Sequence, residues 1–357
     1  MPVSLSDFRD VAALDFDEII DVRSPSEYAE DHIAGAVNLP VLSDAERAQV
    51  GTIYTQESPF KARKIGAALV AQNAARHLQT FLSDKPGGYR PLVYCWRGGQ
   101  RSNAFASILS QIGWRSEVLK GGYKSYRRLV VETLYKRPLP SLVMLLDGDT
   151  GSGKTEILQN LVGLDWQIID LEHMARHRGS VLGGFAEPQP SQKSFESNLA
   201  WQVSRLDPNR PVVVEAESSK VGAINLPPSL WSAMRLAPRL VLQVPRLARV
   251  RHLLRNYGDL SLAETSDRLG LLRRQHGVKQ LEQWQDMLAR GETEALALSL
   301  MELHYDPLYR RGREGRTGSP LSLGETALDP NEMAATTARV SAGLKALSPQ
   351  AADLAEP

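Results

Sequence analysis

Cysteine is nearly absent from this chain of 357 residues, which has only Cys95. A single cysteine excludes an intramolecular disulfide and a zinc site built on several cysteines, and it is typical of a reducing compartment such as the cytoplasm. Long apolar runs are lacking too, so we expect no membrane-spanning segment and no signal peptide. Charge is balanced at 42 Lys and Arg against 41 Asp and Glu, so any nucleic-acid contact must come from a local patch.

The lone cysteine stands where an apolar strand meets a helix. Leu-Val-Tyr-Cys at 92–95 is followed by Trp-Arg-Gly-Gly-Gln-Arg-Ser. The N–H groups that open the helix and the charges of Arg97 and Arg101 favour the thiolate, which is the nucleophilic form. The same donors suit an anion brought to the sulfur. We predict Cys95, Arg97 and Arg101 to be catalytic; the alternative is a buried structural cysteine.

A second motif, at 148–155, reads Gly-Asp-Thr-Gly-Ser-Gly-Lys-Thr and follows an apolar run. It fits the phosphate-binding P-loop, Gly-x4-Gly-Lys-Thr, between a strand and a helix. Backbone N–H groups of such a loop wrap a phosphate, the lysine neutralises its charge and the threonine can hold Mg²⁺. The predicted phosphate-binding residues are Gly148, Gly151, Ser152, Gly153, Lys154 and Thr155. The motif does not identify the ligand as ATP.

Strand-like and helix-like segments alternate along the chain, which predicts parallel α/β sheets. A proline pair at Pro138 and Pro140 marks a boundary. We therefore expect one α/β domain at 1–137 and a P-loop NTPase-like α/β domain with a basic helical C-terminal extension at 138–325. Residues 326–357, rich in Ala, Pro and Ser, are expected to form a flexible tail.

Acidic residues follow two strands predicted in the second domain, at 166–172 and 211–217. The carboxyl ends of strands in an open α/β sheet are where ligands bind. Glu215 and Glu217 are therefore candidates to orient Mg²⁺ or a water molecule; helix capping or pairing with arginine is the alternative. The histidines show no zinc-ligand spacing, so we assign no metal beyond Mg²⁺.

Two short segments combine cations with aromatic or histidine side chains. Residues 120–128 interleave Lys and Arg with two tyrosines, which suits phosphates and a stacked base, and 176–178 read Arg-His-Arg. An ordinary surface patch is the alternative for both. The predicted RNA-binding residues are Lys124, Arg127, Arg128, Arg176 and Arg178.

The segments 20–23 and 32–40, followed by the Cys95 loop, resemble a rhodanese domain. The chain as a whole is similar to the tRNA 2-selenouridine synthase family. The similarity rests on the rhodanese-like segments joined to a P-loop, and on Asp170–Ser180 and Tyr305–Tyr309. The resemblance covers roughly residues 10 to 310. It implies a cytoplasmic transferase that acts on tRNA bearing 2-thiouridine at the wobble position. Such an enzyme first geranylates the sulfur with geranyl diphosphate, then replaces the S-geranyl group with selenium from selenophosphate.

This resemblance gives each motif a role. The P-loop, with Glu215 or Glu217 and Mg²⁺, would bind the diphosphate of geranyl diphosphate. Selenophosphate would meet Cys95, which would carry selenium as a perselenide or act directly on the modified base. Expected partners are the tRNA and a selenophosphate-producing enzyme, and the chain is expected to be a monomer. Ala216 departs from the family's Glu-Asp-Glu-Ser pattern at 215–218.

Two rival functions stay open at this point. An ATP-dependent kinase or ligase coupled to rhodanese-type sulfur transfer on RNA predicts nucleotide hydrolysis that depends on Lys154. A P-loop regulator or RNA-binding protein with a rhodanese docking module predicts no modified nucleoside. The intact Cys95 loop argues against the second rival, because a docking module has no need of the thiol.

Overall fold

The computed structural model describes residues 2–97, 99–180, 183–185, 187–256, 261–314, 316–318, 320–326 and 328–353. Gly98, part of the predicted cysteine loop, lies outside them. The chain divides into two compact units: unit 1 is Met1–Arg137 with Pro190–Arg205, and unit 2 is Pro138–Gln189 with Leu206–Pro357. Residues 190–205 thus group with the first unit, whereas the sequence analysis expected them in the second domain.

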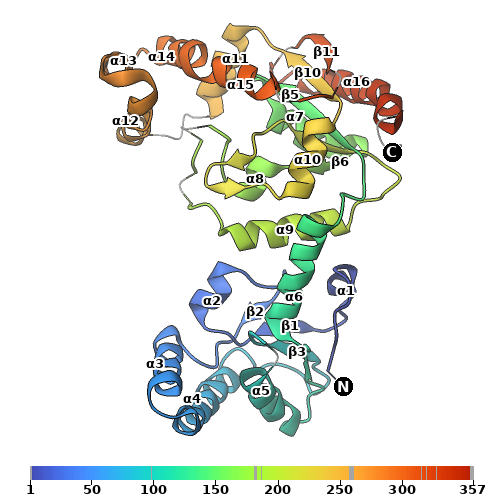
Figure 1. Ribbon diagram of the computed structural model, residues 1–357, viewed down its shortest axis with the longest axis vertical. Helices are drawn as coiled ribbons and strands as arrows, with labels where there is room; N and C mark the ends of the chain where they lie inside the picture. Colours follow the sequence, from blue (N-terminus) through green and yellow to red (C-terminus); the bar gives the residue numbers. More distant parts are fainter. Residues whose placement is uncertain are drawn as a thin grey trace. The chain divides into compact units, whose positions relative to one another are not determined.

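Unit 1 is built on a four-stranded parallel sheet of order β2-β1-β3-β4. Its strands are β1 (Glu18–Asp21), β2 (Val37–Asn38), β3 (Pro91–Tyr94) and β4 (Glu117–Val118). Its helices are α1 (Arg9–Ala12), α2 (Pro25–Glu30), α3 (Asp44–Gln56), α4 (Pro59–Gln79), α5 (Gln100–Gln111), α6 (Gly122–Val131), η1 (Glu132–Lys136) and α9 (Gln192–Ser204). Helices α4 and α5 lie on one side of the strands and α6 on the other, with α9 beside α6 (Figure 1).

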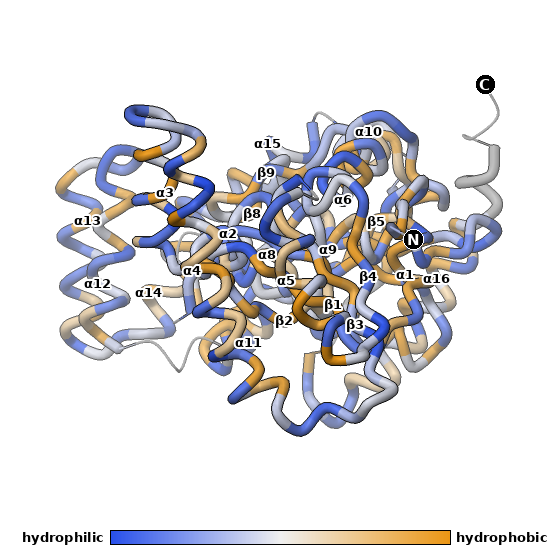
Figure 2. The backbone as a smooth tube through the Cα atoms, turned by 90° about the horizontal axis from the view of Figure 1, so that it is seen from below, coloured by the Kyte–Doolittle hydropathy of each residue, from blue (hydrophilic) through white to orange (hydrophobic). Residues whose placement is uncertain are grey.

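Alternating apolar residues explain the core of unit 1. Ile20 and Val93 from the central strands, Val70 from α4, and Phe105 and Leu109 from α5 are buried together. Burial of this apolar surface is the main force that holds the helices on the sheet. Strands β1 and β3 accordingly lie among hydrophobic segments in Figure 2.

An antiparallel helix pair, α3 and α4, separates β2 from β3 along the chain. Ser43 caps α3 in a capping box with Glu46, and Ser58 followed by Pro59 starts α4. The first helix buries only Ile53, whereas α4 buries Val70 and Ala74 against the core. Most of the outer helix therefore stays in contact with solvent.

Unit 2 is a five-stranded parallel sheet of order β11-β10-β5-β7-β6. The strands are β5 (Val143–Gly148), β6 (Gln167–Ile169), β7 (Val212–Glu215), β10 (Arg239–Gln243) and β11 (Pro320–Glu325). The chain runs from β5 to β6 and β7 on one side, then returns to β10 on the other. The loop after β5 therefore opens at the point where the strand order reverses, which is the usual ligand-binding position in an open α/β sheet.

Helices surround this sheet and extend beyond it. They are α7 (Lys154–Leu161), η2 (Val162–Leu164), α8 (Leu171–Ala175), α10 (Pro228–Leu236), α11 (Arg246–Asn256), α12 (Leu262–Gly270), α13 (Arg273–Ala289), α14 (Thr293–Leu300), η3 (Met301–Tyr305), α15 (Asp306–Glu314) and α16 (Met333–Asp353). A short antiparallel pair, β8 (Lys220–Val221) and β9 (Ile224–Asn225), completes the unit. Helices α12 and α13 alternate hydrophilic and hydrophobic segments in Figure 2. Leu269 of α12, Trp284 of α13 and Leu300 of α14 belong to an apolar cluster separate from the core of the sheet. The predicted α/β class with a helical C-terminal region is confirmed.

The expectation of a flexible tail after residue 325 is wrong for α16. Val340, Leu344 and Leu347 are buried in the core of unit 2 beside Leu240 and Leu158. These positions recur at helical spacing, so one face of α16 is apolar. No helix in the described part of the chain is long and apolar enough to cross a membrane.

Candidate active sites

The P-loop of unit 2 has the backbone shape that its glycines permit. Gly151 and Gly153 adopt φ values of 79° and 73°, in the left-handed region that other residues avoid. A Cβ at Gly148 would lie 2.4 Å from the Ser152 Oγ atom, so the loop could not close over a larger residue. The loop delivers Lys154 to the first turn of α7.

A cavity of about 370 Å³ opens over this loop. Residues 150–156 line it, together with Glu172, Arg178, Phe185, Leu253 and Tyr309. The hydroxyls of Thr150 and Ser152 are buried with no hydrogen-bond partner among the described residues. Buried donors without partners cost free energy, so the loop is prepared for a ligand that accepts hydrogen bonds, such as a phosphate.

Lys154 also lines this cavity. Its Nζ atom donates to the carbonyl oxygen of Gly148 at 2.7 Å and lies 4.9 Å from the centre of the Tyr309 ring. The structure therefore brings together the predicted residues Gly151, Ser152, Gly153, Lys154 and Thr155 at the cavity, whereas Gly148 does not line it.

Two carboxylates line the cavity, Glu156 and Glu172, and the sequence analysis selected neither. The Oε2 atom of Glu172 accepts a hydrogen bond from the Thr155 hydroxyl at 2.7 Å. Glu215 accepts the backbone N–H of Glu172 at 2.7 Å and does not line the cavity. The sequence did contain a signal for Glu172. This residue follows the predicted strand at 166–172 and lies within the segment 170–180, on which the resemblance rests.

Burial dominates the chemistry of this acidic group. It raises the pKa of Glu172 to about 8, with a further contribution from the neighbouring charge of Glu217. Burial also raises the pKa values of Glu215 and Glu217. One oxygen of each of these two side chains is buried without a hydrogen-bond partner in the described chain. The group is therefore short of positive charge.

Two arginine pairs hold the P-loop from outside the cavity, one buried and one partly exposed. Arg249 pairs with both oxygens of Asp306 at 2.8 and 2.9 Å and donates to the Thr150 carbonyl at 3.1 Å. Arg313 contacts Asp147 at 3.0 Å, at the end of β5. Both Asp306 and Arg313 belong to α15, so this helix supports the loop and also provides Tyr309 to the cavity.

Cys95 of unit 1 lies directly after β3 and is 4% exposed. Its Sγ atom accepts hydrogen bonds from the Ser102 hydroxyl and the Gly99 N–H, each at 3.4 Å. Burial alone raises the pKa of the thiol, but hydrogen bonds from Ser102 and from the N–H groups of Gly99 and Arg97 outweigh it and leave the pKa below its usual value. The loop thus supports a thiolate nucleophile.

The arginines act differently from what the sequence analysis expected. Arg101 forms an ion pair with Glu27 at 2.9 Å, and the largest effects on the Cys95 pKa are burial and hydrogen bonds rather than arginine charge. Arg97 is exposed and has no ion-pair partner among the described residues. Arg97 therefore remains available to an anion at the sulfur, while Arg101 ties the start of α5 to α2.

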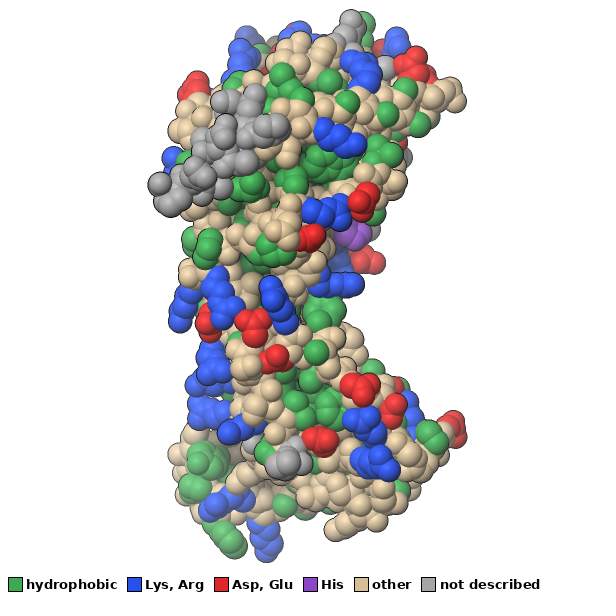
Figure 3. Space-filling view, turned by 90° about the vertical axis from the view of Figure 1, so that its right-hand side faces the viewer, with side chains coloured by type: hydrophobic (Ala, Val, Ile, Leu, Met, Phe, Trp, Pro, Cys, Tyr) green, Lys and Arg blue, Asp and Glu red, His purple; other side chains and the backbone are tan. Residues whose placement is uncertain are grey.

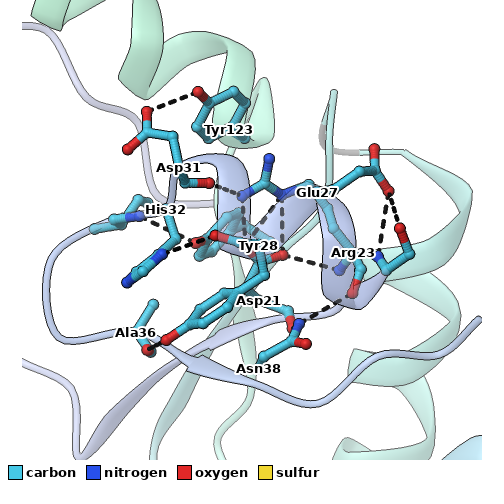
Figure 4. Close-up of polar contacts among 12 residues, drawn as sticks. Asp21, Arg23, Glu27, Tyr28, Asp31, His32, Ala36, Asn38 and Tyr123 are labelled. Carbon is cyan, nitrogen blue, oxygen red and sulfur yellow. Dashed lines mark hydrogen bonds and ion pairs between the residues drawn. The ribbon is translucent and has the colours of Figure 1, made fainter. Parts of the chain in front are cut away.

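Asp21, Arg23, Asp31 and Tyr123 form a buried polar network in unit 1 (Figure 4). Arg23 bonds to Asp21 and to the Asp31 carbonyl, both at 2.6 Å, and its guanidinium lies 4.0 Å from the centre of the Tyr123 ring. The Tyr123 hydroxyl donates to Asp31 at 2.7 Å, and its N–H donates to the Cys95 carbonyl at 2.8 Å. Arg23, from the motif at 20–23, is thus linked to the Cys95 backbone through Tyr123.

The predicted RNA-binding residues separate into three groups. Arg127 pairs with Glu196 of α9 inside unit 1, so its charge is already used. Arg178 lies at the P-loop cavity over the Phe185 ring, and Arg176 pairs with Glu187 at 3.4 Å. Lys124 and Arg128 are exposed and have no charged partner within the described ranges. Lys and Arg side chains are spread among acidic ones on the face shown in Figure 3.

Comparisons with known proteins bear on both units. Residues 141–291 match the family model described as tRNA 2-selenouridine synthase AAA domain, and residues 6–129 match the rhodanese-like domain. In solved structures, the N-terminal domain of a Clostridium difficile 630 protein is 34% identical, with a TM-score of 0.33. That match covers 37% of this chain and all of that domain.

Curated relatives match across both units. The tRNA 2-selenouridine synthase of Nitrosomonas europaea is 37% identical over 67% of this chain, which spans 63% of that relative's length. That of Shewanella denitrificans is 31% identical, over 82% of this chain and 87% of the relative. Because the second relationship includes the rhodanese-like and P-loop units together, the chain belongs to the tRNA 2-selenouridine synthase family.

Proposed function

We propose that this protein converts 2-thiouridine at the wobble position of tRNA to 2-selenouridine, by geranylation of the sulfur followed by selenation. The observation that carries the proposal is the presence of two different sites in one chain. One is a P-loop cavity with buried hydroxyls that lack partners, and the other is a cysteine whose pKa is lowered. The name of the relatives denotes the product of such a reaction sequence.

The P-loop cavity suits geranyl diphosphate as the first co-substrate. Backbone N–H groups of 151–155 and the hydroxyls of Thr150 and Ser152 would bind the diphosphate, and Phe185, Leu253 and Tyr309 offer apolar surface for the isoprenoid. The thiocarbonyl sulfur of the base attacks C1 of the geranyl group. Diphosphate leaves with the C–O bonding electrons, and N3 of the base releases its proton.

Lys154, and a cation held with the help of Glu172, would neutralise the negative charge of the leaving diphosphate. Lys154 can exchange its bond to the Gly148 carbonyl for a phosphate oxygen. No group of three or more His, Cys, Asp or Glu residues in the described chain is arranged to hold a metal. Mg²⁺ in enzymes often uses one or two carboxylates together with substrate phosphates, which fits Thr155 and Glu172 with Glu217 behind them. When bound, Mg²⁺ would neutralise the departing diphosphate.

Cys95 would then act on C2 of the S-geranylated base. Its thiolate forms a bond to C2 and displaces geranyl thiolate; the selenium of selenophosphate next displaces Cys95. Water cleaves the Se–P bond and releases phosphate, so no redox change occurs. A perselenide on Cys95 would instead require selenium to lose two electrons, with phosphite as the leaving product. Arg97 is placed to bind the phosphate group of selenophosphate.

The remaining partners follow from this reaction. Lys124 and Arg128 are free to contact phosphates of the tRNA, whereas Arg127 is tied to Glu196. Because only one cysteine is present, we place the protein in the cytoplasm. We further propose that it acts as a monomer supplied by a selenophosphate-producing enzyme.

Mass spectrometry of nucleosides tests the proposal directly. A 2-thiouridine anticodon stem-loop is incubated with the protein, Mg²⁺, geranyl diphosphate and selenophosphate, each omitted in turn. The expected products are S-geranyl-2-thiouridine with the prenyl donor alone and 2-selenouridine when selenophosphate is added. An unchanged base under every combination, with ATP hydrolysis that depends on Lys154, would instead favour the kinase or ligase alternative.

A further inference from the structure

A groove of about 840 Å³ opens beside the Cys95 loop within unit 1. Helices α3 and α4 form one wall, and the other comes from Trp96, Arg97 and the first residues of α5. The groove therefore begins at the residue next to the nucleophile. Its volume is in the range of pockets that bind small organic ligands.

The groove is lined largely by apolar surface. Val50 and Tyr54 of α3 face Ala67 and Val70 of α4, and Trp96 adjoins them from the cysteine loop. The Tyr54 side chain is 56% exposed and that of Trp96 is 37% exposed. Large apolar groups around one concave surface indicate a binding site for an apolar ligand, because its burial there would remove both surfaces from water.

Positive charge surrounds this apolar surface. Arg63 and Arg97 have no acidic partner among the described residues. Arg47 and Arg101 share Glu27, at 3.0 and 2.9 Å, so two cations compete for one carboxylate. A ligand that suits the whole groove therefore combines a hydrocarbon with anionic groups, as a lipid-modified nucleic acid does.

We propose that this groove binds the geranyl chain of S-geranyl-2-thiouridine in tRNA while Cys95 attacks the base. The inference rests on the proposed function. In that reaction C2 of the base must reach the Cys95 sulfur, and the ten-carbon chain is linked to C2 through one sulfur atom. The chain must consequently lie close to the cysteine loop, where the groove offers apolar surface and its arginines can contact neighbouring phosphates.

This arrangement makes the second site selective for the product of the first. RNA with unmodified 2-thiouridine would leave the apolar surface of the groove exposed to water, whereas the geranyl chain of the modified base would cover it. Selenation would then follow geranylation by recognition of the chain as well as by leaving-group chemistry.

Binding measurements on the full chain test this role. A Cys95→Ala background prevents turnover, and fluorescence anisotropy compares stem-loops carrying S-geranyl-2-thiouridine and 2-thiouridine. Tyr54→Ser is expected to weaken binding of the geranylated RNA by about five- to tenfold, with less than about twofold change for the thiolated RNA. Ala67→Trp, which fills the groove from an exposed position, is expected to act in the same direction.

Phe60→Ser is the matched control, because Phe60 is 71% exposed on the same helix pair and does not line the groove. It should change neither affinity. Equal losses for both RNAs in Tyr54→Ser would mark a general RNA surface and overturn the proposal. Unchanged affinities in both Tyr54→Ser and Ala67→Trp would assign the groove to another occupant, such as a protein or a second copy. Either failure is distinct from failure of the proposed function, which wild-type formation of 2-selenouridine tests separately.

Discussion

At Cys95, burial and hydrogen bonding act on the thiol pKa in opposite directions. Burial raises the pKa, and donors from Ser102, Gly99 and Arg97 lower it by a larger amount. Since the pKa of the thiol is lowered in the folded protein, the thiolate persists to a lower pH than in a free cysteine. Reactivity that requires the thiolate is lost only as the pH falls through this lowered value.

Ser102→Ala is expected to move this titration upward. The variant removes the 3.4 Å contact between Oγ and Sγ. A hydrogen bond to an ionised group contributes about 1.5–3 kcal/mol in general, and one pKa unit corresponds to about 1.4 kcal/mol. A weak bond to sulfur should therefore account for about one unit. Iodoacetamide alkylation, followed against pH, measures the shift at the single cysteine.

Ser110→Ala provides the control for this measurement, because Ser110 is exposed near the other end of α5. Its alkylation profile should match that of the wild type. An unshifted profile in Ser102→Ala would mean that the backbone N–H groups alone hold the thiolate.

Some functional residues could be selected from the sequence and others could not. Cys95 and Lys154 stand in local motifs whose spacing indicates their chemistry, so both could be selected from the sequence. Glu172 could not be separated from Glu215 and Glu217, because all three follow strands that end at the same edge. Only the folded chain shows that Thr155 bonds to Glu172 while Glu215 bonds to its backbone.

At the scale of elements, α11 and α15 brace the P-loop through one buried ion pair and adjoin a second, exposed one. Arg249 and Asp306 are buried, whereas Arg246 and Glu302 are each about half exposed. Breaking a buried pair leaves an uncompensated charge away from water, but an exposed pair is solvated in either state. Loss of the buried pair should therefore lower the free energy of unfolding more than loss of the exposed pair.

Asp306→Asn should consequently destabilise unit 2 far more than Glu302→Gln. We expect a loss of about 3–5 kcal/mol for the buried pair and about 0–1 kcal/mol for the exposed one. Calorimetric unfolding of both variants, with and without diphosphate to identify the transition of unit 2, measures the difference. Equal stabilities would show that Arg249 finds another acceptor when Asp306 is neutral.

Two helices show why element assignment from sequence was incomplete. Polar side chains join α9 to unit 1 in addition to the ring contact of Trp201 with Phe8: Ser197 donates to Asp31 at 2.8 Å, and Glu196 pairs with Arg127. Such residues read as solvent-facing in a sequence. Helix α16 is rich in Ala and Ser, which suggested a tail, yet Leu344 and Leu347 recur on one face and are buried. The β-strands before the two motifs were easier to anticipate, because apolar runs precede each loop.

At the scale of the whole molecule, each proposed reaction has a site formed within one unit. The P-loop cavity is lined by residues of unit 2, from Thr150 to Phe185 and from His252 to Tyr309, and the Cys95 loop and its groove use residues of unit 1. No residue in the described part of the chain lines both sites. The two steps should therefore be separable by substitution, and the order of the steps should be set by the chemistry of the base.

RNA that already carries S-geranyl-2-thiouridine allows the selenation step to be measured without the geranylation step. Lys154→Met is expected to slow geranylation of 2-thiouridine RNA by about a hundredfold or more, since a cation at the leaving diphosphate is lost. The same variant should convert pre-geranylated RNA to 2-selenouridine at close to the wild-type rate. Cys95→Ala should show the reverse pattern, with S-geranyl-2-thiouridine accumulating. Nucleoside mass spectrometry over time distinguishes these outcomes. If Lys154→Met also failed on pre-geranylated RNA while remaining folded, the P-loop would have to serve selenation as well, and the assignment of one step to each unit would not hold.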